Sequence, residues 1–369
     1  MTVNGNVAPQ GGNGAATGTQ REEGLLHCLR KGQAPRDGGG QRQGARSVFR
    51  RKRYQPLPDL GHFSHLFGCL SSRPWRIAVL VPAICLVHTA ACAGNALLIP
   101  LIWLDSQLHT PTYLLLGQLS VMDLTLASSI IPKMLADLFS GRRSISLLAC
   151  GAQIFFSLTI AIAECILITF MCFDRYVAIC NPLRYAAIVS PRVCLQMAAA
   201  AWAGGALTSL GHTAFTLHLH VCSPREIPHF FCEVMAVLRI ACEDISAYEK
   251  AVVVTSILVL LLPLSLILSS YVVIFLTVLR MRSPEARSKA LATCSSHLCV
   301  VGLYFGPGMF IYMRPGSAKT PKLNQGLFLF GTVLTPFLNP LAYSFRNKEV
   351  LGSLRKMVSQ CRDRIIIVS

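Results

Sequence analysis

Long apolar stretches separated by short polar segments dominate the chain from about residue 75 onward. Seven stretches can be distinguished, each near the roughly 20 residues that a helix needs to cross a bilayer. All contain some polar residues, the second and seventh are the weakest, and several contain proline, which packed membrane helices tolerate. The pattern predicts seven membrane-spanning helices, over residues 77–104, 113–138, 147–179, 193–216, 251–279, 290–312 and 323–345.

Composition agrees with a protein that lies in the lipid bilayer. Of the 369 residues, 53% are hydrophobic and 14% are charged, whereas soluble domains carry about 25% charged residues. A transporter or channel is disfavoured, because the sequence has neither a repeat between its two halves nor paired polar gates. An enzyme is disfavoured as well, because no catalytic triad, His-Glu-x-x-His sequence or phosphate-binding glycine loop occurs in a usable context.

The first 74 residues differ in character from the rest. They are basic, rich in Gly, Gln and Arg, and show no apolar period. We predict a disordered tail over residues 1–74, a membrane domain over residues 75–346, and a C-terminal segment over residues 347–369. Clustered arginine can attract nucleic-acid phosphates, but an unstructured tail with no nucleic-acid partner is the simpler interpretation.

Charge gives conflicting indications about orientation in the membrane. Basic residues normally stay on the cytoplasmic side. The basic loop around residues 280–289 and the basic segment around residues 346–356 indicate a cytoplasmic C-terminus. Because seven spans place the two chain ends on opposite sides, the N-terminus is then extracellular, although the charge of the tail argues for the opposite.

A charged triplet, Asp174-Arg175-Tyr176, ends the third apolar stretch shortly before Pro182. Charged side chains are costly in lipid and rare in spanning helices, so the triplet is a functional-site hypothesis in its own right. The segment around it, Met171-Cys172-Phe173-Asp174-Arg175-Tyr176-Val177-Ala178-Ile179-Cys180-Asn181-Pro182-Leu183, resembles the signature of olfactory receptors, a branch of the rhodopsin-like (class A) G-protein-coupled receptors.

Further markers of that family occur in the expected order, and the resemblance covers residues 75–358. One of them, the segment that contains Thr112, departs from the family, which usually has Met at that position. The markers are Gly94-Asn95, Leu108-His109-Thr110-Pro111-Thr112-Tyr113, Leu119-Ser120-Val121-Met122-Asp123, Lys289-Ala290-Leu291-Ala292-Thr293-Cys294-Ser295-Ser296-His297 and Pro336-Phe337-Leu338-Asn339-Pro340-Leu341-Ala342-Tyr343-Ser344-Phe345-Arg346-Asn347.

The resemblance implies an all-α membrane protein, a seven-transmembrane helix bundle in the plasma membrane with an extracellular N-terminus and a cytoplasmic C-terminal amphipathic helix. The sequence supports that last element, because Val350, Leu351, Leu354, Met357 and Val358 recur at helical spacing. Such a helix lies on the membrane surface with its apolar face in the lipid.

The resemblance also implies an activation switch. Arg175 is expected to pair with Asp174 in the inactive receptor and to meet a G protein after release. Tyr271 and Tyr343 are expected to offer hydroxyls to the released arginine. The residues that the family assigns to this switch are Asp174, Arg175, Tyr176, Tyr271, Asn339, Pro340 and Tyr343.

Two carboxylates, Asp123 and Glu164, fall at bilayer depth, where rhodopsin-like receptors hold a sodium ion. Two nearby carboxylates share a proton or a cation rather than ionise freely. Asn95 and Asn339 are expected to supply amide ligands or hydrogen bonds. The residues therefore allow two interpretations, a sodium site or a neutral, hydrogen-bonded pair of acids.

Four of the 15 cysteines stand apart from those in the helices. The resemblance implies the disulfides Cys150–Cys232 and Cys222–Cys242, on the oxidising outer face; sequence alone does not choose this connectivity. His229 near Cys232 invites a metal-site hypothesis. We favour a histidine packed by its aromatic neighbours, because the disulfide would occupy the cysteine.

Helical phase and the resemblance together place a ligand pocket between the third, fifth and sixth spans. None of the predicted lining residues is charged, which suits a small, mostly apolar molecule. The expected ligand-binding residues are Ser157, Leu158, Ala161 and Ile162, then Thr255 and Val259, then Phe305, Met309 and Tyr312.

The leading functional hypothesis is an odorant receptor that binds a small volatile molecule and activates a stimulatory, olfactory-type G protein, with cyclic AMP as messenger. Olfactory trafficking chaperones are expected partners beside the lipid bilayer. One alternative is a receptor for an internal metabolite outside the nose. Another is a poorly trafficked orphan member of the family, because the chain has no Asn-x-Ser/Thr glycosylation sequence.

Overall fold

The computed structural model describes residues 62–65, 74–140, 144–221, 226–314, 320–344 and 348–368. The chain divides into two compact units, Met1–Arg51 and Lys52–Ser369, and all described residues lie in the second. The described part of this second unit is almost entirely helical, in agreement with the predicted fold class. Residues 1–61 and 66–73 of the predicted tail lie outside the described residues.

Within the described residues, six helices are long and apolar enough to cross a membrane. One of them, Ser246–Arg280, is interrupted by a π-helical turn and consists of α8, η4 and α9. The bounds are α2 (Pro74–Leu104), α3 (Pro111–Ser140), α4 (Leu147–Cys180), α6 (Pro191–His218), α8 (Ser246–Ser256), η4 (Ile257–Leu261), α9 (Leu262–Arg280) and α10 (Pro284–Tyr312).

The seventh predicted span is divided into three pieces. Helices α11 (Pro321–Leu329) and α12 (Thr335–Ser344) are joined without a gap by a π-helical turn, η6 (Phe330–Leu334). None of the pieces spans a bilayer alone, but together they reach roughly 35 Å at about 1.5 Å per residue, which exceeds the ~30 Å hydrocarbon core. The structure therefore confirms the predicted seven-helix bundle.

Serine and proline mark where helices begin and end. The Ser190 hydroxyl accepts the N–H of Val193 at the start of α6, and the Ser283 hydroxyl accepts that of Ala286 at the start of α10. In both helices proline follows directly as the first helical residue, where its missing N–H costs nothing. Conversely, α4 ends at the residue before Asn181-Pro182, since proline disfavours helical conformation in the preceding residue.

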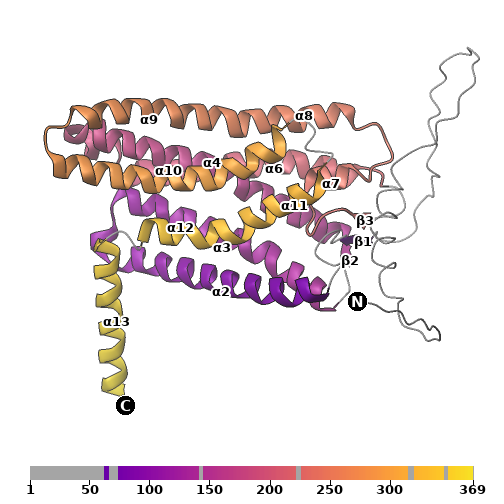
Figure 1. The fold of residues 1–369 in the computed structure, drawn as a ribbon, viewed down its shortest axis with the longest axis horizontal. Coiled ribbons are helices and arrows are strands. Elements are labelled where there is room, and N and C mark those ends of the chain that lie inside the picture. Colours follow the sequence, from indigo (N-terminus) through magenta and orange to yellow (C-terminus); the bar gives the residue numbers. More distant parts are fainter. Residues whose placement is uncertain are drawn as a thin grey trace, which may run out of the picture. The chain divides into compact units, whose positions relative to one another are not determined.

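A small three-stranded sheet lies at one end of the bundle, which we call the sheet end (Figure 1). Strand β1 (His62–His65) runs antiparallel to β2 (Ser144–Ser146) and parallel to β3 (Glu226–Ile227). Because β1 falls within residues 1–74, the prediction that this whole segment is disordered is wrong for residues 62–65. The strand pairs with segments far away in sequence, and so short a stretch carries no local signal for such pairing.

Helix α13 (Lys348–Val368) lies at the opposite end of the bundle, which we call the α13 end (Figure 1). Its Val350 is buried in the same apolar cluster as residues of α3 and α4. The Tyr113 hydroxyl donates to Glu349 (2.7 Å), and the Lys356 ammonium donates to Gln107 (3.0 Å) in η2 (Ser106–Leu108). The predicted C-terminal helix therefore forms and is attached to the bundle.

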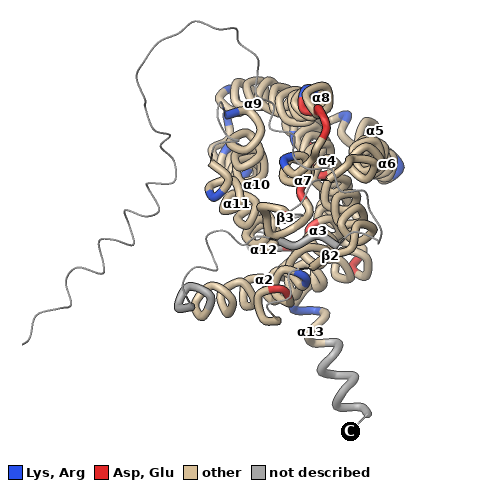
Figure 2. The backbone as a smooth tube through the Cα atoms, turned by 90° about the vertical axis from the view of Figure 1, so that its right-hand side faces the viewer, with Lys and Arg blue, Asp and Glu red and all other residues tan. Residues whose placement is uncertain are grey.

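Helix α4 is the central helix of the bundle. It packs against α3, α6, α9 and α10, and its most extensive packing interface is with α6. Figure 2 looks along the bundle from the sheet end and shows that most of these helices carry few charged residues. Gly205 permits the close approach of α6, because a side chain there would collide with the carbonyl oxygen of Thr159. Small residues at such crossings are typical of membrane helices.

Candidate ligand cavity and activation site

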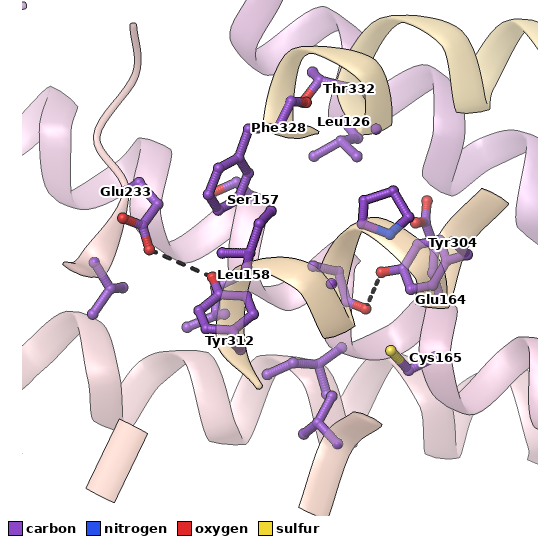
Figure 3. A pocket seen from close by; sticks show the side chains of 18 of the residues that line it. Leu126, Ser157, Leu158, Glu164, Cys165, Glu233, Tyr304, Tyr312, Phe328 and Thr332 are labelled. Carbon is purple, nitrogen blue, oxygen red and sulfur yellow. Dashed lines mark hydrogen bonds between the residues drawn. The ribbon is translucent and has the colours of Figure 1, made fainter. Parts of the chain in front are cut away.

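A cavity of about 200 Å³ lies among α3, α4, α6, α8, α10 and α11. Figure 3 shows some of the side chains that line it. Most of its wall is apolar, as expected for a small-molecule site. Of the predicted ligand-binding residues, those on α4, those on α8 and η4, and the last residue of α10 line it. They are Ser157, Leu158, Ala161, Ile162, Thr255, Val259 and Tyr312.

The predictions for Phe305 and Met309 need correction. Phe305 is buried in the apolar cluster between α4, α9 and α10, and Met309 packs against that cluster. Tyr304 and Gly308, one residue earlier in each case, line the cavity instead. Apolar periodicity could not fix the rotation of α10, because a helix between lipid and protein is apolar on both faces.

The expectation of an uncharged cavity is also wrong. Asp123 and Glu164 border the cavity, as do Glu233 and His212. Glu233 is the N-terminal cap of α7 (Val234–Leu238) and accepts the N–H groups of Met235 (3.0 Å) and Ala236 (2.8 Å). The prediction considered only residues of the third, fifth and sixth spans and left out Glu233, which is held at the cavity wall because it follows Cys232.

Burial raises the pKa of the Glu233 carboxyl group, although the hydrogen bonds from Met235 and Ala236 act in the opposite direction. The Tyr312 hydroxyl at the end of α10 donates a longer hydrogen bond, 3.4 Å, to the same carboxyl group (Figure 3). Glu233 is therefore bound firmly by its own loop and only weakly by α10.

His212 connects α6 to α8, two helices that border the cavity. Its Nδ1 lies 2.9 Å from the Tyr248 hydroxyl, and its Nε2 lies 3.2 Å from the Thr255 hydroxyl. Because α6 carries the histidine and α8 carries its two partners, these bonds fix the position of α8. The predicted ligand contact Thr255 therefore already has a protein partner.

The predicted polar network connects three helices deeper in the bundle. The Asn339 amide on α12 donates to both carboxyl oxygens of Asp123 on α3, at 3.1 and 2.9 Å. The Asn95 amide on α2 donates to the carbonyl oxygen of Pro336 (2.9 Å). Among the described residues, the buried carbonyl oxygens of Asn95 and Asn339 and one carboxyl oxygen of Glu164 have no hydrogen-bond partner.

At the α13 end, three groups surround the carboxylate of Asp174. The hydroxyls of Thr112 (2.8 Å) and Tyr185 (2.7 Å) each donate to one of its oxygens. The Arg175 guanidinium lies 3.8 Å away and is 15% exposed. The predicted pair is thus present, but the two hydroxyls make the closer contacts, and sequence reasoning missed both.

Tyr185 lies in the short helix α5 (Tyr185–Ile188), which follows η3 (Pro182–Arg184) after α4. Burial raises the pKa of its phenol, and the neighbouring Asp174 carboxylate adds to the shift. The phenol therefore remains protonated and can continue to donate its hydrogen bond. Asp174 is held by the segment that follows its own helix and by the first turn of α3.

The other predicted switch residues occupy different positions. The Tyr271 hydroxyl lies 2.9 Å from Nδ1 of His297, whose Nε2 lies 3.2 Å from the carbonyl oxygen of Ile168. Tyr271 thus connects α9 to α10 and α4. Tyr176 packs between two apolar clusters. Pro340 lies within α12, and the side chain of Tyr343 lies outside the described part of the chain.

The disulfide Cys150–Cys232 is confirmed and joins the start of α4 to the long segment before α7. Cys242 is also disulfide-bonded, but its predicted partner Cys222 lies outside the described residues, so that pairing stays a prediction. His229 packs against Phe230 and Phe231, with ring centroids 4.6 and 4.7 Å away.

Seven spans, a largely apolar cavity and the Asp174–Arg175 pair at the opposite end together have the form of a rhodopsin-like receptor. The family model described as "Olfactory receptor" matches residues 84–361. Human olfactory receptor 2T27 is 48% identical over 80% of this chain and 93% of its own length. Olfactory receptor 2V1 of the mouse is 48% identical (77% and 90%), and human olfactory receptor 2T7 is 49% identical (75% and 90%). The chain belongs to the olfactory receptor family of multi-pass plasma membrane proteins.

Proposed function

We propose that this receptor binds a small, mostly apolar odorant in the cavity beside α4 and signals through a stimulatory, olfactory-type G protein that raises cyclic AMP. The cavity carries the proposal. Its volume of about 200 Å³ is below the roughly 300–1,000 Å³ of sites for drug-sized molecules. Its mainly apolar wall favours a volatile molecule with at most a few polar atoms.

The contacts of α10 suggest how binding reaches the other end of the bundle. Tyr304 on α10 donates a hydrogen bond to the carbonyl oxygen of Ala161 on α4, and both residues border the cavity. A ligand there competes for space with this contact and shifts the balance between two positions of α10. Outward movement of α10 separates Tyr271 from His297 and leaves Arg175 free to meet the G protein.

We also propose a sodium ion beside Asp123 and Glu164. The buried oxygens of Asn95, Asn339 and Glu164 that lack hydrogen-bond partners are hard donors suited to such a cation. Bound sodium would hold α3 and α12 together in the inactive arrangement. The measurement is thermal stability of the purified receptor in sodium against potassium at equal ionic strength. Sodium should raise the melting temperature of the wild type but not of Asp123→Asn, and equal shifts in both proteins would contradict the site.

The test of the odorant proposal combines cyclic AMP with surface staining of an N-terminal tag, in cells that supply olfactory trafficking chaperones. A broad odorant panel is applied to the wild type, to Ala161→Leu, and to Ala203→Leu as matched control. Ala161 lines the cavity, whereas Ala203 is exposed on the outer face of α6.

Three added carbon atoms should fill part of the cavity, so Ala161→Leu should lower odorant potency at least tenfold at equal surface level. Ala203→Leu should respond as the wild type does. Equal potency in all three proteins would exclude this cavity as the odorant site. Normal surface staining with no response to any odorant would count against an odorant as ligand.

A further inference from the structure

A second cavity, of about 120 Å³, lies beside the first and closer to the sheet end. It is bordered by the segment around α7, the end of α10 and the start of α11. The two cavities have part of their walls in common, so the same side chains separate them. These shared residues are Glu233, Val252, Ser256, Ile311, Tyr312 and Phe328.

We propose that this outer cavity is a vestibule through which the ligand reaches the inner cavity, and that the Tyr312 side chain is the gate between them. The inference rests on the proposed function, since it takes the inner cavity to be the odorant site. The molecule that passes is a small neutral amphiphile, held first by polar groups and then by apolar ones.

The rim of the outer cavity supports access from solvent. Arg239, Val253 and Pro321 border it and are exposed. The exposed Arg239 adds a positive charge to the rim of the outer cavity alone, whereas the part of the inner cavity around Leu158 and Ile162 is apolar. A polar head can therefore be held at the rim while the apolar part of the molecule moves inward.

The contacts of the shared wall identify its movable part. Glu233 is fixed by two backbone N–H groups of α7. Tyr312 is the last residue of α10, and its polar contact with Glu233 is 3.4 Å long. Its ring meets Phe328 edge-on at 6.4 Å between centroids. In Figure 3, the Tyr312 hydroxyl points toward Glu233. A change of its rotamer breaks one weak hydrogen bond and opens the wall.

The test measures access to the inner cavity without an odorant. Ser157→Cys places a reporter thiol in the inner cavity, in a Cys165→Ser background that removes the free native thiol among the described residues lining that cavity, since Cys232 is held in a disulfide. Cells are treated with a biotin-linked, membrane-impermeant methanethiosulfonate, and biotin on surface receptor is followed over time. Receptor without the Ser157→Cys reporter gives the background from other cysteines.

Tyr312→Ala should raise the labelling rate of the reporter at least about tenfold, because the side chain that closes the wall is removed. Tyr312→Phe loses only the hydrogen bond to Glu233, so its rate should rise by about 2- to 5-fold, as a bond of ~0.5–1 kcal/mol allows. A reporter at the rim, Val253→Cys, lies in front of the gate and should react at the same rate in all three proteins.

Equal labelling rates of the inner reporter in wild type, Tyr312→Phe and Tyr312→Ala would contradict the proposal that Tyr312 is the gate. Labelling of the inner reporter only by a membrane-permeant reagent would overturn the vestibule in favour of access from the lipid. Because labelling needs neither odorant nor G protein, these outcomes are separate from those that test the proposed function. Surface staining of each variant ensures that only folded receptor is compared.

Discussion

The two ends of the bundle differ in how some of their hydroxyl groups are bonded. At the α13 end, side chains from different elements bind one another directly, as Thr112 and Tyr185 do with Asp174. Around the cavity, several hydroxyls turn back to their own helix. Ser157 donates to the carbonyl oxygen of Gln153 (2.6 Å), and Thr332 donates to that of Phe328 (2.8 Å).

This difference implies that the two ends tolerate substitution to different degrees. A cavity wall whose polar groups are already satisfied can change its shape by substitution without losing a partner for a buried group. A carboxylate that accepts from several donors, as Asp174 does, tolerates substitution less well. The loss of one donor changes the strength of the remaining hydrogen bonds and so the relative stability of the inactive and active receptor. The cavity is therefore suited to vary in ligand, and the α13 end is suited to keep one mechanism.

The largest expected effect comes from breaking the covalent link at the sheet end. The disulfide of Cys232 closes a segment of 82 residues, and removal of such a link costs about 2–5 kcal/mol. Cys232→Ser should therefore abolish nearly all surface staining. Cys299→Ser, which removes an exposed free cysteine of α10, should leave staining unchanged. Normal staining of Cys232→Ser would show that the sheet end does not depend on the link.

At the α13 end, Arg175→Ala should remove the cyclic AMP response while surface level stays near that of the wild type. Asp174 keeps its bonds to Thr112 and Tyr185 in this variant, so the fold should survive. The measurement is the odorant-stimulated response divided by surface staining. The more exposed Arg184, in η3 next to α5, supplies the control, and Arg184→Ala should retain signalling. A full response from Arg175→Ala would contradict the proposed switch.

The α13 end was the more predictable of the two from sequence. Arg175 and Asp174 are adjacent in the chain, and a charged pair at a helix end is visible in any apolar pattern. The hydroxyl donors were missed because Thr112 and Tyr185 approach Asp174 only through tertiary packing. The spans were recognised by their length and apolar content. The π-helical turn η6 in the seventh span changes neither property, so that span was recognised as well.

The sheet end was less predictable. The residues of α4 were placed correctly at the cavity, because the charged triplet fixes the phase of that helix. Helix α10 is apolar on both faces, so Phe305 and Met309 were placed one residue out of phase. Glu233 and His212 were missed because the pocket was predicted between the third, fifth and sixth spans only, whereas the cavity wall also includes a loop segment and α6. Strand β1 was missed for a similar reason, because it forms by pairing with β2 and β3, which are distant in sequence.

A smaller effect is expected from Thr112→Met, which introduces the residue usual for the family. The hydroxyl of Thr112 donates to the carboxyl group of Asp174, and its loss should weaken the inactive arrangement by ~1.5 kcal/mol. Basal cyclic AMP should rise about tenfold at equal surface level. Thr112→Ser keeps the hydroxyl and should remain near the wild type. Equal basal activity in all three proteins would show that this hydrogen bond does not hold the inactive state.

The smallest effect is expected from Ser157→Ala, compared with Ser209→Ala. The Ser157 hydroxyl lines the cavity but is bound to its own helix, so its removal should change potency for an apolar odorant by less than about 3-fold. Ser209 is fully buried and donates from α6 to the carbonyl oxygen of Phe155 on α4 (2.8 Å). Such bonds contribute ~0.6 kcal/mol between membrane helices. Ser209→Ala should therefore lower surface level slightly and leave potency unchanged, and a tenfold potency loss in Ser157→Ala would show that the ligand itself binds this hydroxyl.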